Sequence, residues 1–267
     1  MAKKKLFLVV LLLNFCFFPI VLADKSASVG SFTGDPLASP PQLAKKWENI
    51  GLDISIGATY LEGNVEILSF MSKLSANAHF DEHSFYIDAS NMFTESNEKR
   101  ILNKINGSFL YAYTINDNLN FYVSSAHTMN EFSKLDYRTS NGIGICVHNF
   151  WKPLFSVFLF SFGFNVENEW FDNDDQENHV TGAFRWTFQL SVTENLKIGS
   201  DFIYVPVVDD AKDFRIYEEA YAEFKITKDE LLAFRVSLIS EYDSQPQPDV
   251  EKSDTGIYVS LVFHLGK

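Results

Sequence analysis

The sequence predicts an all-β fold, a transmembrane antiparallel up-and-down β-barrel of about 12 strands. Apolar residues recur at every second position along most of the chain, which is the period of a strand with one apolar and one polar face. Beyond the N-terminal leader, no apolar run is long enough for a membrane helix, and 155–164 comes closest. Short connections alternate with longer, acidic ones, as in membrane barrels.

The first 23 residues are predicted to be a secretory signal peptide. Lys3–Lys5 supply the positive start, Leu6–Leu22 is apolar, and Val21-Leu22-Ala23 fits a cleavage site. An uncleaved membrane anchor is the alternative, which Pro19 near the end of the apolar run disfavours. A lipoprotein anchor at Cys16 is disfavoured because Asn and Phe, not small residues, precede it.

Residues 24–46 are predicted to be a flexible periplasmic segment, and 47–267 to be the barrel domain. The segment 24–46 is polar and contains glycine and proline, so it has too few apolar residues for a core. Trp47 then marks the start of the ordered part and suits a membrane interface.

The first hairpin sets the pattern for the strands. In 50–61, Ile and Leu at even positions alternate with Gly, Asp and Ser at odd ones, and Glu62-Gly63-Asn64 supplies a turn before the return strand 65–80. The same pattern predicts strands at 84–94, 101–115, 119–132, 137–148, 154–170, 180–193, 196–205, 214–226, 231–242 and 255–265. The strand at 154–170 begins apolar on both faces, so its facing is ambiguous.

The connections give an independent check on this count. Those after even-numbered strands are short: 81–83, 116–118, 149–153, 194–195 and 227–230. Longer, acidic connections follow odd-numbered strands: 172–179, 206–213 and 244–254. An even number of strands with short turns on one side places both termini in the periplasm.

Charge and cysteine usage exclude several classes of partner. The formal net charge is −13, and the leader contains only basic charges, so the rest of the chain is more acidic still. Without a basic stripe, nucleic acid is not expected as a partner. Cys146 is the single cysteine after the leader, which excludes an intramolecular disulfide, and no Cys/His metal spacing is present. No cofactor is expected.

Three segments, in order, resemble one known family. They are Trp47 with Gly51, Leu52, Gly57 and Glu62-Gly63-Asn64; Leu135–Thr139 leading into Gly142-Ile143-Gly144; and Glu241–Asp243 with Pro246, Pro248 and Lys252–Asp254. Over about 47–265 the chain resembles the YdiY-like, salt-induced outer membrane proteins, domain of unknown function 481.

The resemblance implies an outer membrane barrel without a known activity. Its expected partners are outer membrane lipid, lipopolysaccharide and the barrel assembly machinery, and the oligomeric state stays open. Two departures stand out: Val65 replaces a usual Ser, and Leu265-Gly266-Lys267 replaces an aromatic end. The second weakens the interpretation of 254–263 as an assembly signal.

Polar residues at the alternate positions that form the polar face of each strand are candidates to line the lumen. They are Asp53, Ser55, Thr59, Lys73, Asn77, Asp88, Lys104, Arg138, Asn141, Arg185, Glu223, Lys225 and Arg235. Such residues set the selectivity of a narrow channel, or acids and bases simply pair across a closed interior. With about twelve strands the bore is modest, and we expect it to be narrow or plugged.

Two groups of side chains are candidates for a catalytic or a metal site. Ser125 and His127 share a strand face, as in barrel lipid hydrolases, but Thr128-Met129-Asn130 does not continue those motifs, so a polar pair on the wall is favoured. Asp172, Asp174, Asp175 and Glu177 are weak candidates for calcium, against the favoured interpretation of solvated loop charge.

The sequence therefore predicts a non-enzymatic outer membrane barrel with a structural, envelope-stress or small-solute channel role. An outer membrane lipid hydrolase and a soluble periplasmic lipid-binding β-protein are the alternatives.

Overall fold

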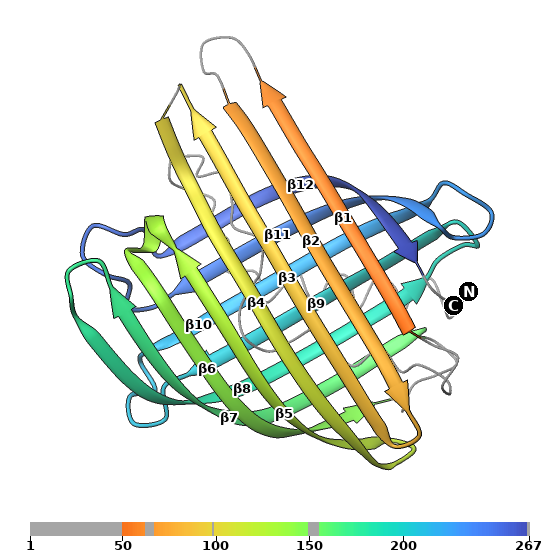
Figure 1. Cartoon of the computed structure of the whole chain (residues 1–267), viewed down its shortest axis with the longest axis horizontal. Coiled ribbons are helices and arrows are strands. Elements are labelled where there is room, and N and C mark those ends of the chain that lie inside the picture. The colour runs from red at the N-terminus through yellow and green to blue at the C-terminus, as the bar shows by residue number, and fades with distance from the viewer. Residues whose placement is uncertain (1–49, 62–66, 98, 149–154, 266–267) are drawn as a thin grey trace, which may run out of the picture.

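The computed structural model describes residues 50–61, 67–97, 99–148 and 155–265, which form one closed β-barrel (Figure 1). The strands are β1 (Ile50–Leu61), β2 (Ile67–Phe80), β3 (His83–Ser96), β4 (Lys99–Asn116), β5 (Leu119–Asn130), β6 (Leu135–His148), β7 (Val157–Phe171), β8 (Gln176–Ser191), β9 (Leu196–Pro206), β10 (Phe214–Lys225), β11 (Leu232–Asp243) and β12 (Ser253–Leu265), with a short 3₁₀ turn η1 (Glu131–Ser133). The predicted signal peptide 1–23, the segment 24–46 and Trp47 lie outside the described residues.

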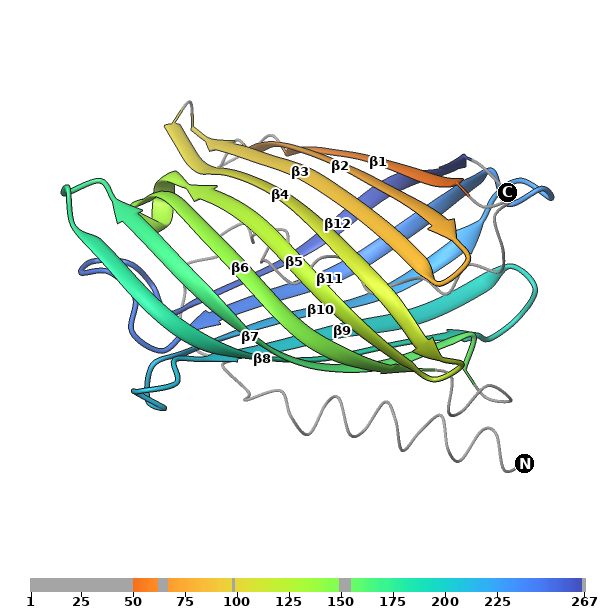
Figure 2. The same ribbon diagram turned by 60° about the horizontal axis from the view of Figure 1, so that its bottom comes forward.

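Each strand pairs antiparallel with its neighbours in sequence, and β1 pairs with β12 to close the barrel. In that closing pair Asp53 lies opposite His264, so β1 begins at the end where β12 finishes. Figure 2 shows the same cylinder from another side, with its strands inclined to the barrel axis. The predicted 12-strand up-and-down barrel is confirmed.

The two ends of the barrel differ in their connections. At one end, which we call the turn end, the described links are 81–82, 117–118, 192–195 and 226–231. At the other, the loop end, they include 131–134, 172–175, 207–213 and 244–252.

The predicted acidic loop 172–179 is shorter than expected, because β8 already begins at Gln176. A tight turn explains this difference: the Asp175 amide donates to Asn173 Oδ1 at 3.1 Å, and Asp174 adopts a positive φ of 65°. Glu177 and His179 therefore lie on a strand and not in a loop.

The outer wall of the barrel is apolar and its interior is polar, the reverse of a soluble protein. Ile257 and Ile143 on the outside are 72% and 55% exposed, whereas Glu167 on the inside is fully buried. Lys104 and Arg185 are also buried. A closed barrel with an apolar exterior and a polar interior is the arrangement that spans a lipid bilayer. No helix in the described part of the chain is long and apolar enough to cross a membrane.

Apolar and aromatic side chains nevertheless fill part of the lumen. One buried cluster contains Tyr86, Leu110, Tyr122, Cys146, Leu159, Ile203 and Tyr217, and a second contains Met71, Met92, Leu102, Ile239 and Tyr258. Gly144 and Gly163 make room for the Tyr122 ring, because a Cβ on either glycine would lie 2.5 Å from the Tyr122 hydroxyl. These glycines allow a ring to project over β6 and β7 and to narrow the bore.

Candidate functional site: a charged vestibule at the loop end

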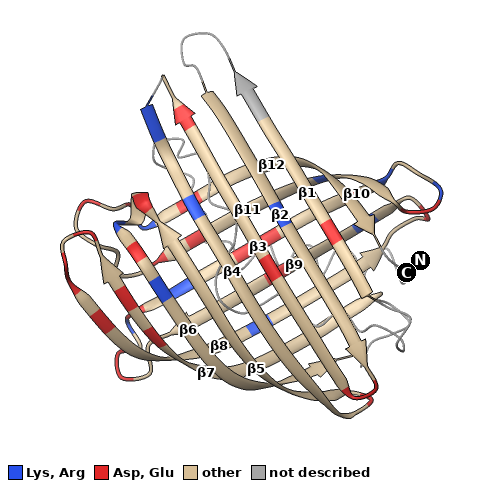
Figure 3. Ribbon diagram, viewed as in Figure 1, with Lys and Arg blue, Asp and Glu red and all other residues tan. Residues whose placement is uncertain are grey.

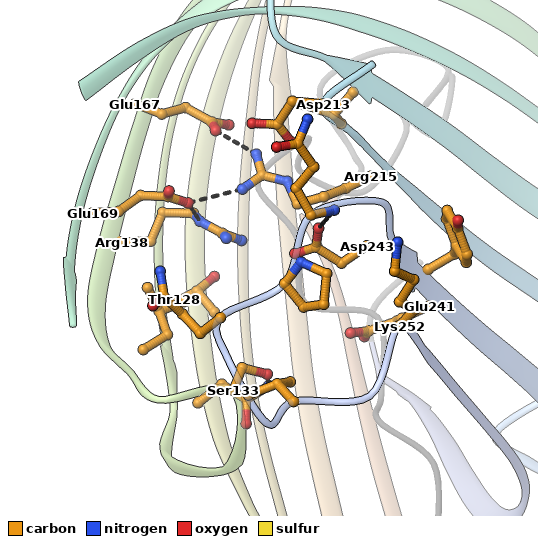
Figure 4. Close-up of a pocket in the computed structure, with 18 of the residues that line it drawn as sticks. Thr128, Ser133, Arg138, Glu167, Glu169, Asp213, Arg215, Glu241, Asp243 and Lys252 are labelled. Atoms are coloured by element: carbon orange, nitrogen blue, oxygen red, sulfur yellow. Dashed lines mark hydrogen bonds and ion pairs between the residues drawn. The ribbon is translucent and has the colours of Figure 1, made fainter. Parts of the chain in front are cut away.

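A cavity of about 190 Å³ lies inside the barrel at its loop end, and we call it the vestibule (Figure 4). Its charged lining comes from strands far apart in the sequence. The principal members are Lys104 on β4, Arg138 on β6, Glu167 and Glu169 on β7, Arg215 on β10 and Glu241 on β11.

The first part of this lining is a network of two arginines and two glutamates. Glu167 and Glu169 alternate on β7, so both face inward, and the register with β6 places Arg138 opposite Glu169. Arg138 and Arg215 both bond Glu169, with Arg215 Nη1 at 2.9 Å from Oε1. Arg215 also bonds Glu167, which accepts a hydrogen bond of 3.1 Å from Ser140 Oγ. The network is therefore neutralised within itself.

The second part is a bridge across the lumen. Lys104 Nζ lies 2.7 and 2.8 Å from the two carboxylate oxygens of Glu241. The ammonium group also lies 5.9 Å from the centre of the Tyr217 ring. Because β4 and β11 are not neighbours in the barrel, this pair spans the bore and restricts it.

The connection 244–252 forms a roof over the vestibule. It is tied to its own base, since Ser244 Oγ accepts from the Phe214 amide at 2.7 Å and Lys252 Nζ donates to the Ser244 carbonyl at 2.7 Å. It also reaches the far side of the mouth, where Lys134 Nζ donates to the Pro248 carbonyl at 2.6 Å. Lys134 belongs to the connection between β5 and β6, so the roof is held from both sides.

Asp213 lies at the edge of the vestibule, in the connection before β10. Burial raises the pKa of its carboxyl above the ordinary value, and the nearby Asp243 carboxylate raises it further. The mouth therefore contains one acid whose charge is disfavoured by its surroundings.

Below the vestibule the interior charges are also paired. Arg185 Nε donates to Asp201 Oδ1 at 2.7 Å, and Thr187 Oγ1 donates to the same oxygen at 2.6 Å. Nearer the turn end, Arg235 Nε donates to Glu223 Oε2 at 3.0 Å. Figure 3 shows basic and acidic positions interspersed on the strands around the lumen. Among the described residues, the lining thus contains no ring of a single charge.

The structure places most of the predicted lumen residues on the inner face. Those facing inward are Asp53, Ser55, Lys73, Asn77, Asp88, Lys104, Arg138, Arg185, Glu223, Lys225 and Arg235. Of these, the vestibule brings together Lys104 and Arg138. The Thr59 side chain lies outside the described part of the chain.

Asn141 was predicted to face the lumen, and this is wrong. It lies three positions after Arg138 on β6, and an odd separation turns a strand residue to the opposite face. Its partner Ser125 also lies on the outer wall.

Four charged residues of the vestibule were not among the predicted lumen residues: Glu167, Glu169, Arg215 and Glu241. A signal for the two β7 glutamates was present, because they alternate with Phe164, Val166 and Trp170 on the outer face.

The predicted calcium candidates do not gather into one site. Among the described residues, Glu169, Glu177 and His179 place ligand atoms within 4.8 Å of one another, whereas Asp172, Asp174 and Asp175 are not part of that group. Two guanidinium groups already bond Glu169, so a metal ion would have to compete with them. We assign no metal to this cluster.

One family model matches most of the chain. The model of the family described as "Protein of unknown function, DUF481" matches residues 54–265. The chain belongs to this family. The resemblance seen in the opening, middle and final segments of the sequence is thereby confirmed. No curated protein sequence matches this DUF481 chain significantly.

Solved structures similar to this DUF481 protein are barrels of low identity. The NanC porin has a TM-score of 0.48 at 9% identity, over 80% of this chain and 99% of that one. The translocator domain of the autotransporter NalP from Neisseria meningitidis has a TM-score of 0.45 at 10% identity, over 81% and 87%. A bacterial polysaccharide outer membrane secretin has a TM-score of 0.38 at 9% identity, over 84% of this chain and 100% of that one. These values are too low to transfer a function.

Proposed function

We propose that this protein is an outer membrane channel of small bore, which admits small polar solutes through the vestibule. The observation that carries the proposal is a cavity of about 190 Å³ lined by charged side chains, inside a barrel whose exterior is apolar. The cavity has room for several waters or one small solute.

The lining favours solutes that carry both signs of charge or none. Arginine, lysine and glutamate groups alternate around the vestibule, so a solute with an ammonium and a carboxylate would find a partner for each. A solute with a single charge would have to break an existing pair, which costs free energy. We therefore propose zwitterionic or neutral polar solutes as the class.

The bore below the vestibule supports a low conductance. Tyr122 and its buried apolar neighbours occupy part of the lumen, and the Arg185–Asp201 pair lies among the remaining polar groups. A twelve-strand barrel is narrower than the larger porins even without such filling.

The proposed orientation places the loop end outside the cell and the turn end in the periplasm. The acidic connections 172–175 and 207–213 would then meet lipopolysaccharide, sharing divalent ions with its phosphates. Export through the predicted signal peptide and insertion by the barrel assembly machinery belong to the same proposal. An envelope-stress or purely structural role is the alternative if no solute passes.

Single-channel recording in planar bilayers tests this function. We expect small conductance steps from the wild type and larger steps when Lys134→Ala releases the roof from the far side of the mouth. Lys212→Ala, an exposed lysine of the 207–213 connection, is the matched control and should leave conductance unchanged. Large steps from the wild type, or no steps from either wild type or Lys134→Ala, would refute the channel.

A further inference from the structure

A polar cluster lies on the outer wall of the barrel, towards the loop end. Ser125 and His127 are on β5, and Tyr137 and Asn141 are on the neighbouring β6. Ser124, Ala126 and Thr128 are buried on the inner face, so the alternating Ser125 and His127 face outward. Polar side chains on a lipid-facing wall are costly, and they are commonly functional.

The contacts within this cluster connect a nucleophile, a base and an orienting group. Ser125 Oγ lies 3.3 Å from His127 Nε2, and His127 Nδ1 lies 2.6 Å from the Tyr137 hydroxyl. Hydrogen bonding of Nδ1 to Tyr137 leaves Nε2 free to accept the serine proton when Nδ1 carries the ring proton. This is the relation between groups on which serine hydrolysis depends.

Aromatic packing holds the imidazole in place. The Tyr137 ring stacks on His127 with centroids 5.8 Å apart and an angle of 22° between planes. Trp170 on β7 packs in turn against Tyr137, with the two ring centroids 5.7 Å apart. A base fixed in this way loses little entropy when it acts.

Asn141 provides a polar group beside the nucleophile. Its side-chain oxygen lies 2.8 Å from Ser125 Oγ, because the two residues are direct partners in the sheet. In this structure the Ser125 hydroxyl donates to that oxygen, and a turn about its Cβ–Oγ bond directs the proton to His127 Nε2, 3.3 Å away.

The wall beside His127 is open to a lipid. The residue opposite His127 on β4 is Gly107, and a Cβ built there would meet nothing within 4 Å. Ile105 and Phe109 flank this glycine and are exposed on the same face. The result is an apolar notch next to the imidazole, suited to a fatty acyl chain.

We propose that Ser125 and His127 form a hydrolytic site for long-chain carboxylic esters of the surrounding lipid, separate from the lumen. Ser125 Oγ bonds to the ester carbonyl carbon as its proton passes to His127 Nε2. The bond from that carbon to the leaving alkoxide oxygen breaks, and His127 returns the proton to the alkoxide to give an alcohol. Water then attacks the acyl-serine through the same base and releases the fatty acid.

Covalent labelling tests whether Ser125 is an activated nucleophile, independently of ester hydrolysis. The full chain, folded in detergent micelles, would be treated with a long-chain alkylsulfonyl fluoride and examined by intact-mass and peptide mass spectrometry. We expect one adduct, on Ser125, whose formation rate falls at least tenfold in His127→Asn. Ser72→Ala, an outward-facing serine on β2, is the matched control and should label as the wild type does. Labelling of the wild type at the rate of Ser125→Ala would overturn the proposal.

Fatty acid release distinguishes the lipid sources. Mixed micelles of palmitoyl-oleoyl phosphatidylethanolamine form one arm and purified lipid A forms the other. We expect release from at least one, abolished by Ser125→Ala and reduced by Gly107→Leu, which fills the notch. Release from neither arm overturns the proposal. Channel conductance of Ser125→Ala should match the wild type, so failure here and failure of the channel are separable.

Discussion

Arg215 is the residue whose removal gives the clearest energetic test of the vestibule. Arg215→Met keeps most of the side-chain volume but removes the charge that bonds Glu167 and Glu169. Glu167 is fully buried, and its remaining contact described above is the hydroxyl of Ser140. Removal of one partner from a buried ion pair costs roughly 3–5 kcal/mol, and the hydrogen bond that Glu167 keeps from Ser140 places the expected loss at the lower end of this range.

The matched control is an ion pair on the surface. Arg100 bonds Glu131 at 2.9 Å, but both side chains are 49% exposed. Arg100→Met removes the same charge from a solvated pair and is expected to cost less than about 1 kcal/mol. Arg215→Met combined with Glu167→Gln should recover most of the loss, because no unpaired carboxylate then remains in the interior.

Urea unfolding in lipid vesicles, followed by tryptophan fluorescence and by heat-modifiable gel mobility, measures the free energy of unfolding of each variant. Equal losses for Arg215→Met and Arg100→Met, within about 0.5 kcal/mol, would refute the reasoning that burial decides the value of these pairs. No recovery in the double variant would show that Arg215 acts through contacts other than the buried carboxylate.

Three further predictions concern the wall, the mouth and the bore. Ile143→Arg, on the outer face, should cost roughly 2–4 kcal/mol in a bilayer; a cost near zero would contradict lipid contact at this position. Asp213→Asn should raise the thermal midpoint at neutral pH, because the raised pKa of Asp213 makes the wild type lose stability as pH rises through the interval between its ordinary and folded values. That advantage should vanish on acidification, and an advantage independent of pH would exclude the charge as its cause. Tyr122→Ala should increase conductance by shortening a side chain that narrows the bore, and unchanged conductance would place the constriction elsewhere.

The local pattern of the chain was enough to predict the strands, but not every boundary. Alternation of apolar and polar residues over several two-residue repeats predicts a strand, whichever strands lie beside it. The start of β8 could not be predicted in this way, because Gln176–His179 is polar throughout and becomes a strand only by pairing with Glu167–Trp170 of β7. The turn at Asn173 and Asp175 sets that register.

Whether a side chain points into or out of the barrel was predictable wherever one inward residue of the same strand was known. Asn141 was placed on the wrong face because its separation from Arg138 is odd. The same parity would have identified Glu167 and Glu169 as interior residues, since the apolar side chains of β7 fix its outer face. Odd or even position along a strand could not show which acidic and basic side chains form ion pairs, because it says nothing about the register of distant strands.

The sequence by itself predicted a barrel with an apolar outside and a polar inside, because twelve segments of period-two alternation can satisfy their backbone groups in a membrane only as a closed sheet. Tertiary structure decided the pairing of Lys104 with Glu241, which are 137 residues apart, and the arrival of Arg215 between the two β7 glutamates. Closure and stagger of the cylinder set these distances, and they depend on all twelve strands together.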